Sequence, residues 1–204
     1  MKSKGIIIAL VCLAILGTAQ AQESKKQKFE FGVETGMTTY TNYSAVSVMQ
    51  DAAARYTGFG YGVHFGRLLG RNMVGIDLSN NYFNTSAVAV NENMLQWSLA
   101  AGYRYYMPIG SRFEAFIGAK LGARYMLNTF DYGANHYSTG RWSGFCNAEL
   151  GVNCKLTEKS HIGITWTLDA GSCLNSVAVP TGLTPNERNA LFGQGLKIHY
   201  GLRF

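Results

Sequence analysis

The chain has 204 residues, of which 13% are aromatic and only 15% are charged, and its formal net charge is +6. Together with twenty-four glycines and three prolines, this composition argues against a disordered chain and a helical bundle and is typical of a β-rich domain. Beyond the N-terminal apolar run, no segment stays apolar for the roughly 20 residues that a membrane-spanning helix needs. A search for long apolar segments would not detect membrane-spanning strands, because their apolar and polar residues alternate.

The N-terminus has the parts of a secretory signal peptide. Lys2 and Lys4 precede an apolar run over residues 6–16, and small residues then lead to an A-x-A site that ends at Ala21. The apolar run is too short to span a bilayer as a helix. We therefore predict a signal peptide over residues 1–21. Lipidation at Cys12 is disfavoured because the preceding residue is valine, where a small residue is expected.

A short basic segment, residues 22–28, follows the predicted cleavage site. Lys25, Lys26 and Lys28 lie within it. We expect this segment to be solvated in the periplasm rather than to bind nucleic acid, since nucleic acid would not be met there. Residues 29–204 are predicted to form one domain.

Eight segments of that domain alternate apolar residues with polar residues or glycine, as strands with two different faces do. In chain order they are residues 29–40, 56–68, 73–83, 93–107, 113–127, 141–155, 161–170 and 192–204. Most reach the roughly 9 to 11 residues that a tilted transmembrane strand needs. The predicted fold is all-β, an eight-stranded antiparallel up-and-down transmembrane β-barrel.

Short and long connections alternate between these strands. Tight turns are predicted at residues 69–72, 108–112 and 156–160, and longer loops at residues 41–55, 84–92, 128–140 and 171–191. With an even number of strands both termini lie at the end with the short turns, which is the periplasmic end of outer-membrane barrels. The predicted location is the outer membrane, with both termini in the periplasm.

Charge is divided unequally between the two faces of the strands. The apolar face carries Phe31, Val33, Phe59, Tyr61, Val63, Phe65, Val74, Ile76, Leu78, Leu95, Trp97, Leu99, Ile117, Leu121, Leu150, Val152, Ile162, Ile164, Trp166, Leu168, Leu196, Ile198, Tyr200, Leu202 and Phe204. The acids absent from the polar face, among them Glu92 and Asp131, fall in predicted loops or near the N-terminus. A soluble sandwich would bury its apolar face, so we predict that this face meets lipid.

The polar face, which we expect to line the lumen, combines glycine with long charged side chains. The charged residues form a predicted lumen network of Glu30, Glu34, Asp77, Arg104, Glu114, Lys120, Arg124, Glu149, Asp169, Lys197 and Arg203. Inward glycines concentrate on the first, second and last strands, which become neighbours when the barrel closes. We call this side the glycine wall, and sequence alone predicts that it is bare.

An eight-stranded barrel has room inside for side chains or one small ligand. We therefore expect the lumen network to form a plug of paired charges, because buried ions are tolerated when paired and hydrogen-bonded. The alternative is a narrow pore, in which a thin water path along the glycine wall passes ions or small solutes. His64 and His199 also face the lumen, where we expect each to hydrogen-bond a carboxylate.

The cysteines give no sign of a disulfide framework or a metal site. Cys146 and Cys154 lie on one predicted strand, eight residues apart, roughly 26 Å at the usual strand rise, so they cannot bond to each other. With Cys173 the count after signal removal is odd, which disfavours a complete set of disulfides. We expect small apolar fillers, no metal site and no cofactor.

A lipid-modifying enzyme would need a nucleophile within hydrogen-bond reach of a base. The candidates are Asp131, His136 and Ser138 in one predicted loop, with Ser172 in another. Loops are rich in such residues, and no nucleophile elbow or spaced triad is visible. We therefore expect a protein that is not an enzyme.

A surface-interaction role is the third class of function, because loops on a rigid scaffold often carry binding sites. The predicted loops 41–55, 128–140 and 171–191 could contact an extracellular partner. The last is the longest and contains the apolar stretch 177–180, which makes it the best candidate contact surface.

The last strand, residues 196–204, has apolar residues at alternate positions and ends on Phe204. It resembles the C-terminal signature of Gram-negative outer-membrane proteins, in which the barrel-assembly machinery reads such a motif. Carried over, the resemblance makes Tyr200, Leu202 and Phe204 the assembly signal. With the leader and the eight-strand pattern, the chain resembles the small outer-membrane barrels of the porin-family group, OmpA-like and OmpX-like. That resemblance implies outer-membrane lipid and lipopolysaccharide as surroundings, and implies no particular chemistry.

Overall fold

The computed structural model describes residues 28–41, 55–87, 90–132, 135–174 and 190–204. The predicted signal peptide lies outside the described residues, as do most of the predicted loops 41–55 and 171–191. No helix long and apolar enough to cross a membrane occurs in the part of the chain that is described.

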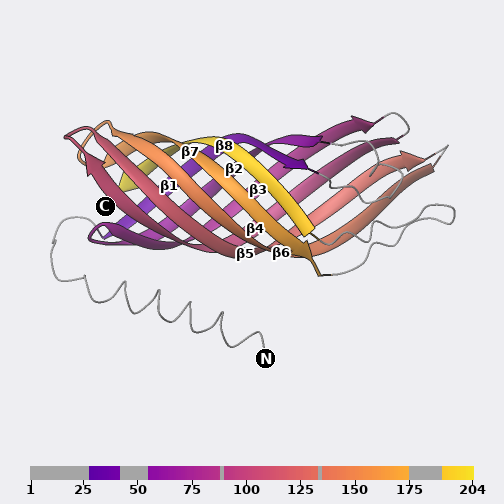
Figure 1. Cartoon of the computed structure of the whole chain (residues 1–204), viewed down its shortest axis with the longest axis horizontal. Coiled ribbons are helices and arrows are strands. Elements are labelled where there is room, and N and C mark those ends of the chain that lie inside the picture. The colour runs from indigo at the N-terminus through magenta and orange to yellow at the C-terminus, as the bar shows by residue number, and fades with distance from the viewer. Residues whose placement is uncertain (1–27, 42–54, 88–89, 133–134, 175–189) are drawn as a thin grey trace, which may run out of the picture.

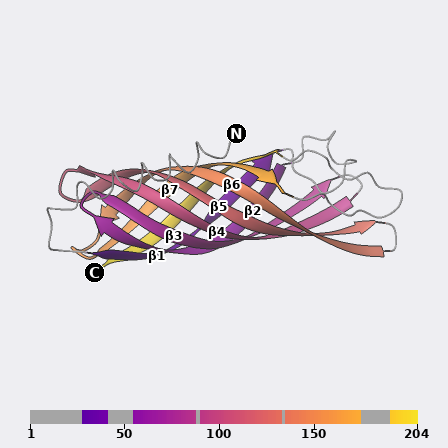
Figure 2. The same cartoon turned by 90° about the horizontal axis from the view of Figure 1, so that it is seen from below.

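Eight strands form a closed ring in which each strand is antiparallel to its neighbours, and the last pairs with the first. They are β1 (Phe29–Thr41), β2 (Arg55–Leu69), β3 (Asn72–Ala87), β4 (Val90–Ile109), β5 (Phe113–Tyr132), β6 (Asn135–Lys155), β7 (Ser160–Cys173) and β8 (Ala190–Arg203). Figures 1 and 2 show the strands inclined to the long axis of the barrel, as closure requires. The predicted eight-stranded up-and-down barrel is confirmed.

The three predicted tight turns are confirmed and lie at one end of the barrel, which we call the short-turn end. Two of them contain a glycine with positive φ, Gly70 at 66° and Gly110 at 70°, where a side chain would be strained. The described start of β1 and the end of the chain lie at the same end, and the backbone N–H of Phe204 donates to the carbonyl of Phe29 at 2.9 Å. We call the opposite end the long-loop end.

The prediction of loops over residues 84–92 and 128–140 is wrong for most of these residues, which belong to strands. Strands β3 and β4 are separated only by residues 88–89, and β5 and β6 only by residues 133–134. These extensions carry mainly polar residues on both faces, so the apolar alternation that marks a lipid-facing strand is lost while the backbone ladder continues. As a result Glu92 lies in β4 and points into the barrel, and Asp131 lies in β5 with its side chain exposed.

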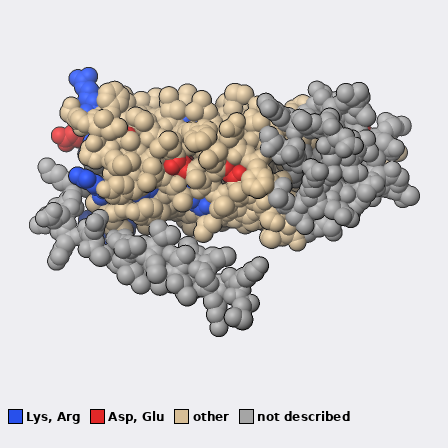
Figure 3. Space-filling view, viewed as in Figure 1, with Lys and Arg blue, Asp and Glu red and all other residues tan. Residues whose placement is uncertain are grey.

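The predicted division of the two faces is confirmed. Large apolar side chains such as Ile76 and Leu121 are exposed on the outside, whereas Arg124 and Glu30 inside are 1% and 0% exposed. In Figure 3 the described body is mostly free of charge on its outside, and lysine and arginine gather at the short-turn end. Ring closure pairs the backbone groups of the first and last strands, so the barrel presents no open edge to lipid.

Candidate functional site

The interior of the barrel is the candidate site, and its first group of charges lies at the short-turn end. Glu30 is fully buried and accepts hydrogen bonds from Arg203 at 2.7 Å and from the Tyr106 hydroxyl at 3.0 Å. Arg203 also pairs with Glu114 at 2.6 Å. The ring of His64 lies 3.1 Å from Glu30. One guanidinium thus bridges two carboxylates and joins strands β1, β5 and β8.

A second group of charges occupies the middle of the barrel around Glu149, whose side chain is fully buried. Arg104 donates to Glu149 at 2.8 Å, and the Lys120 ammonium lies 2.7 Å from the same carboxylate. Lys120 also pairs with Asp77 at 2.5 Å, and Arg104 approaches Asp77 at 3.8 Å. Two bases and two acids therefore neutralise one another, as buried charges require.

Two further ion pairs complete the set. Lys197 pairs with Glu34 at 2.5 Å across the β8–β1 seam. Nearer the long-loop end, Arg124 donates to Asp169 at 2.6 Å and to the hydroxyl of Tyr40. Each member of the predicted lumen network therefore has at least one partner of opposite charge.

Large apolar side chains fill the interior on either side of the central charges around Glu149. At the short-turn end they are Met73, Tyr106 and Phe116, and at the long-loop end they are Tyr40, Tyr56, Phe83, Met94, Met126, Cys173 and Leu191. The Arg203 and Arg104 guanidinium groups lie 4.7 Å and 5.2 Å from the ring centres of Tyr106 and Phe116, so the short-turn apolar cluster also contacts the cations. These inward apolar residues were not recognised from sequence as part of the lumen filling.

The glycine wall is not bare, which corrects the sequence-based prediction. An added side chain at Gly32 would overlap the ring of His64, and one at Gly58 or Gly193 would overlap an aromatic ring. The overlapping residues stand opposite these glycines on the neighbouring strand: His64 opposite Gly32, Phe83 opposite Gly58 and Tyr40 opposite Gly193. Each glycine leaves room for a large side chain on the neighbouring strand, and these side chains fill the space along the glycine wall.

Among the described residues a cavity lies in the interior, between the central charges and the long-loop apolar cluster. Its volume is about 50 Å³, enough for a few water molecules. The side chains around it are mostly polar and include Glu34, Thr38, Asp77, Gln96, Lys120, Asn147, Glu149, Thr167, Asp169 and Lys197. The cavity is therefore a small polar pocket beside the ion pairs.

The residues considered for catalysis lie outside the barrel interior and only partly converge. His136 Nδ1 is 2.7 Å from Asp131, and both side chains are about two-thirds exposed, at 67% and 64%. Ser138 lies two residues from His136 on β6, and Ser172 lies on β7. Within the described residues no hydrogen bond joins His136 to either serine, so a base is present without an aligned nucleophile.

The three described cysteines are free thiols. Cys146 and Cys154 lie on the outer face of β6, and Cys173 is buried in the long-loop apolar cluster. Cys146 and Cys154 lie on one strand, as predicted, so they cannot bond to each other.

Several buried polar residues were missed or misread from sequence. His199 hydrogen-bonds Asn153 at 2.7 Å and Thr165 at 3.0 Å rather than a carboxylate. Glu92 was assigned to a loop, yet it is fully buried and accepts hydrogen bonds from Tyr56 at 2.8 Å and Asn128 at 2.5 Å. Every second residue of β4 faces inward. Extending this alternation beyond the apolar part of the strand would have identified Glu92 as an inward residue.

The family model described as outer membrane protein beta-barrel domain matches residues 8–204. It thus covers all of the described strands. A comparison with curated proteins found no match.

Solved structures with similar folds are all distant in sequence. Neisserial surface protein A is 12% identical with a TM-score of 0.59, covering 86% of this chain and 97% of that one. The attachment invasion locus protein Ail of Yersinia pestis is 12% identical with a TM-score of 0.47, covering 87% of this chain and 99% of its own. OprG from Pseudomonas aeruginosa is 16% identical with a TM-score of 0.46, covering 87% and 97%. At these identities the likeness concerns the fold alone.

Proposed function

Because this chain belongs to the outer-membrane β-barrel protein family and is an outer-membrane protein, we propose that it acts as a closed membrane scaffold with a surface-interaction role. The barrel anchors the chain in lipid and lipopolysaccharide, and the long-loop end faces the cell exterior. In this orientation both termini lie in the periplasm, which is the usual side of the short turns. The role requires neither catalysis nor a conducting lumen.

The filled interior is the observation that carries the proposal. Ion pairs cross the middle of the barrel, and apolar clusters fill it on either side of the central charges. Moving an ion through this path would require breaking pairs such as Lys120 with Glu149, which are nearly inaccessible to solvent. Buried pairs are costly to separate, because each freed charge is left without compensation.

The surface role is supported by the long-loop end. Strands β4, β5 and β6 have 20, 20 and 21 residues, whereas β1 has 13. A transmembrane strand needs only about 9 to 11 residues, so these strands are long enough to project beyond the lipid, and in Figure 1 the long-loop end reaches past the ends of β1 and β8. Most of the predicted contact segment 128–140 thus forms part of the projecting edge, which is suited to an extracellular partner together with the predicted segments 41–55 and 171–191.

A narrow pore is the second candidate, and the cavity of about 50 Å³ favours it. That polar space would become part of a water path if the long-loop apolar cluster opened. In the closed arrangement the cluster has nearly inaccessible members such as Phe83 and Met94, at 0% and 1% exposure, so we place this function second.

Single-channel recording in planar bilayers distinguishes the two functions. We expect no steady conductance from the purified protein. A Lys120→Glu variant reverses a charge beside the cavity, and Arg71→Glu reverses an exposed charge at a short turn as the matched control. A steady conductance that shifts in Lys120→Glu and is unchanged in Arg71→Glu would establish the pore and overturn the plug.

A further inference from the structure

Three potential metal ligands meet inside the barrel because of the strand register. Asp77 on β3 stands directly opposite His64 on β2, and Glu34 on β1 stands opposite Gly62, two residues from His64. A Cβ atom at Gly62 would lie 3.1 Å from Glu34 Oε1, so the glycine lets the Glu34 side chain extend across β2. One ligand atom from each of Glu34, His64 and Asp77 lies within 4.8 Å of the others.

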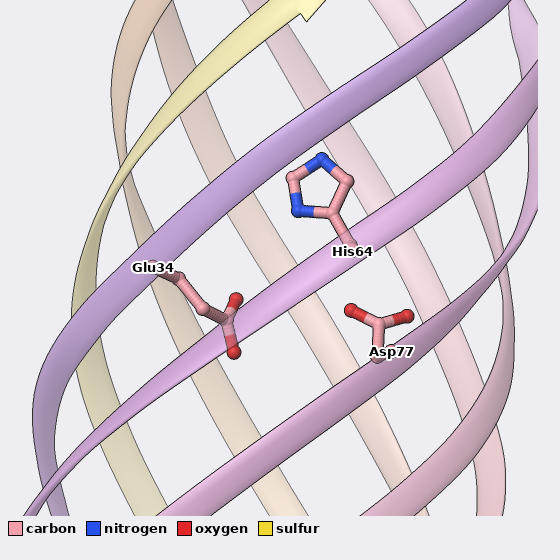
Figure 4. Close-up of side chains that lie close together, drawn as sticks. All are labelled: Glu34, His64 and Asp77. Carbon is pink, nitrogen blue, oxygen red and sulfur yellow. The ribbon is translucent and has the colours of Figure 1, made fainter.

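The imidazole of His64 is oriented toward the two carboxylates. Its Nε2 lies 3.1 Å from Glu30, and because a carboxylate only accepts, Nε2 must carry the hydrogen. Its Nδ1 is buried and has no hydrogen-bond partner among the described residues, and His64 is 1% exposed. Figure 4 shows one ring nitrogen of His64 on the side of Glu34 and Asp77.

Lys120 and Lys197 already pair with the two carboxylates, so the group that lacks a partner among the described residues is His64 Nδ1. In the neutral ring the Nδ1 lone pair faces two negative groups, and in the protonated ring a buried N–H has no acceptor. A metal ion would accept the Nδ1 lone pair and both carboxylates at once.

The surroundings of His64 resemble the outer shell of metal-binding histidines. Such histidines donate their second ring N–H to a carboxylate, which fixes the ring and increases its basicity. Here Glu30 receives that hydrogen bond, and Arg203 and Tyr106 hold Glu30 in place. The glycine at position 32 leaves the space that the ring of His64 fills.

One imidazole and two carboxylates match a first-row divalent transition metal ion such as Zn²⁺ or Mn²⁺. Bonds of roughly 2.1 Å place ligand atoms about 3 to 4 Å apart, so a small inward movement of the Glu34 and Asp77 side chains closes the site. Ca²⁺ and Mg²⁺ are disfavoured, since they prefer a shell made only of oxygen atoms.

Two lysines compete for the carboxylates. Lys120 can release Asp77 and keep Glu149, from which it is 2.7 Å distant. Lys197 pairs with Glu34, and its flexible side chain lines the adjoining cavity, where it can turn aside. Of the two cations Lys197 is therefore the one whose removal most directly frees a ligand.

We propose that Glu34, His64 and Asp77 form a lumen site for a divalent transition metal ion, in competition with Lys197. This extends the predicted plug, because the metal ties strands β1, β2 and β3 together. It does not depend on the proposed surface role, and the sequence pattern had suggested no metal site.

Calorimetric titration of the chelator-treated protein in detergent micelles with ZnCl₂ and MnCl₂ tests the proposal. We expect one equivalent to bind, His64→Gln and Glu34→Gln to weaken binding at least tenfold, and Lys197→Met to tighten it. His136→Gln removes an exposed histidine outside the barrel and is the matched control. The gain expected in Lys197→Met separates ligation from a general loss of structure.

A Co²⁺ titration adds a spectroscopic readout, because visible absorption bands report the ligands of the metal. The bands should appear in the wild type and in His136→Gln and be absent in His64→Gln. Absence of stoichiometric binding to the wild type, equal affinity in His64→Gln, or no gain in Lys197→Met would each overturn the site. A gel shift between boiled and unboiled samples verifies that each variant is folded.

Discussion

At the scale of single residues, charged side chains fill much of the interior of this barrel, whereas apolar side chains such as leucine fill the interior of a soluble protein. A buried guanidinium is tolerated here because it has several partners: Arg124 contacts Asp169, the Tyr40 hydroxyl and the ring of Phe145, whose centre is 4.1 Å from the guanidinium carbon. Removing one member of such a pair leaves the other charge buried without compensation. We therefore expect removal of both charges of an ion pair to destabilise the barrel less than removal of one of them.

Arg124→Met tests this asymmetry. We expect the free energy of unfolding to fall by about 3 kcal/mol, because Asp169 keeps its charge without a partner. The double variant Arg124→Met/Asp169→Asn should recover more than half of that loss. Urea unfolding in lipid vesicles measures both, and Arg71→Met at an exposed turn should change stability by less than about 0.5 kcal/mol. Equal losses in the single and double variants would contradict the explanation.

At the scale of the strands, glycine and large side chains alternate between neighbours. Gly151 on β6 stands opposite Phe116 on β5, and a Cβ atom at Gly151 would overlap the phenyl ring and approach a backbone carbonyl of β7. Gly144 on the same strand has no atom within 4 Å of its would-be Cβ. The inward Gly151 thus serves packing, whereas the outward Gly144 does not.

Gly151→Ala and Gly144→Ala form a matched pair for this packing. We expect Gly151→Ala to destabilise the barrel by about 1 to 3 kcal/mol through overpacking. Gly144→Ala should leave stability within about 0.5 kcal/mol, since the added methyl group meets open space. Unfolding midpoints in urea for both variants give the comparison. A larger loss at Gly144 than at Gly151 would show that the packing argument is mistaken.

The strands also show how far the sequence could be interpreted. The lipid-facing parity predicted the number of strands, their order, the tight turns and the inward direction of residues such as Arg104 and Lys120. The alternation of apolar and polar residues failed as a guide beyond the lipid, because both faces of β5 and β6 are polar there. Pairing partners were also beyond reach, because they depend on cross-strand register. That register brings Glu34, His64 and Asp77 together although 30 and 13 positions separate them along the chain.

At the scale of the whole molecule, closure of the ring places both described ends side by side. The Phe204 ring centre lies 6.3 Å from that of Phe29, and the Phe204 side chain is 60% exposed. Such an exposed residue contributes little to the stability of the folded barrel. Its position at the end of the last strand instead suits the assembly signal that the C-terminal motif implies.

Phe204→Ala should separate assembly from stability. We expect the folded fraction in cells to drop several-fold, because the assembly machinery no longer reads the last strand. Refolding of the purified variant into synthetic vesicles should match the wild type, with a stability change under about 1 kcal/mol given the exposure of the side chain. The mobility of unheated samples on gels measures both fractions. Equally impaired refolding in vesicles would assign Phe204 to the fold itself.

The Glu30–Arg203 pair links positions 173 residues apart. During synthesis the carboxylate is made first and its guanidinium partner comes almost last. A polypeptide that stops before β8 would therefore leave Glu30 without Arg203 and the sheet with an open edge. It could not enter lipid without exposing the unpaired carboxylate and the open edge. Only a chain translated through to β8 can therefore pair Glu30 with Arg203 and close the ring.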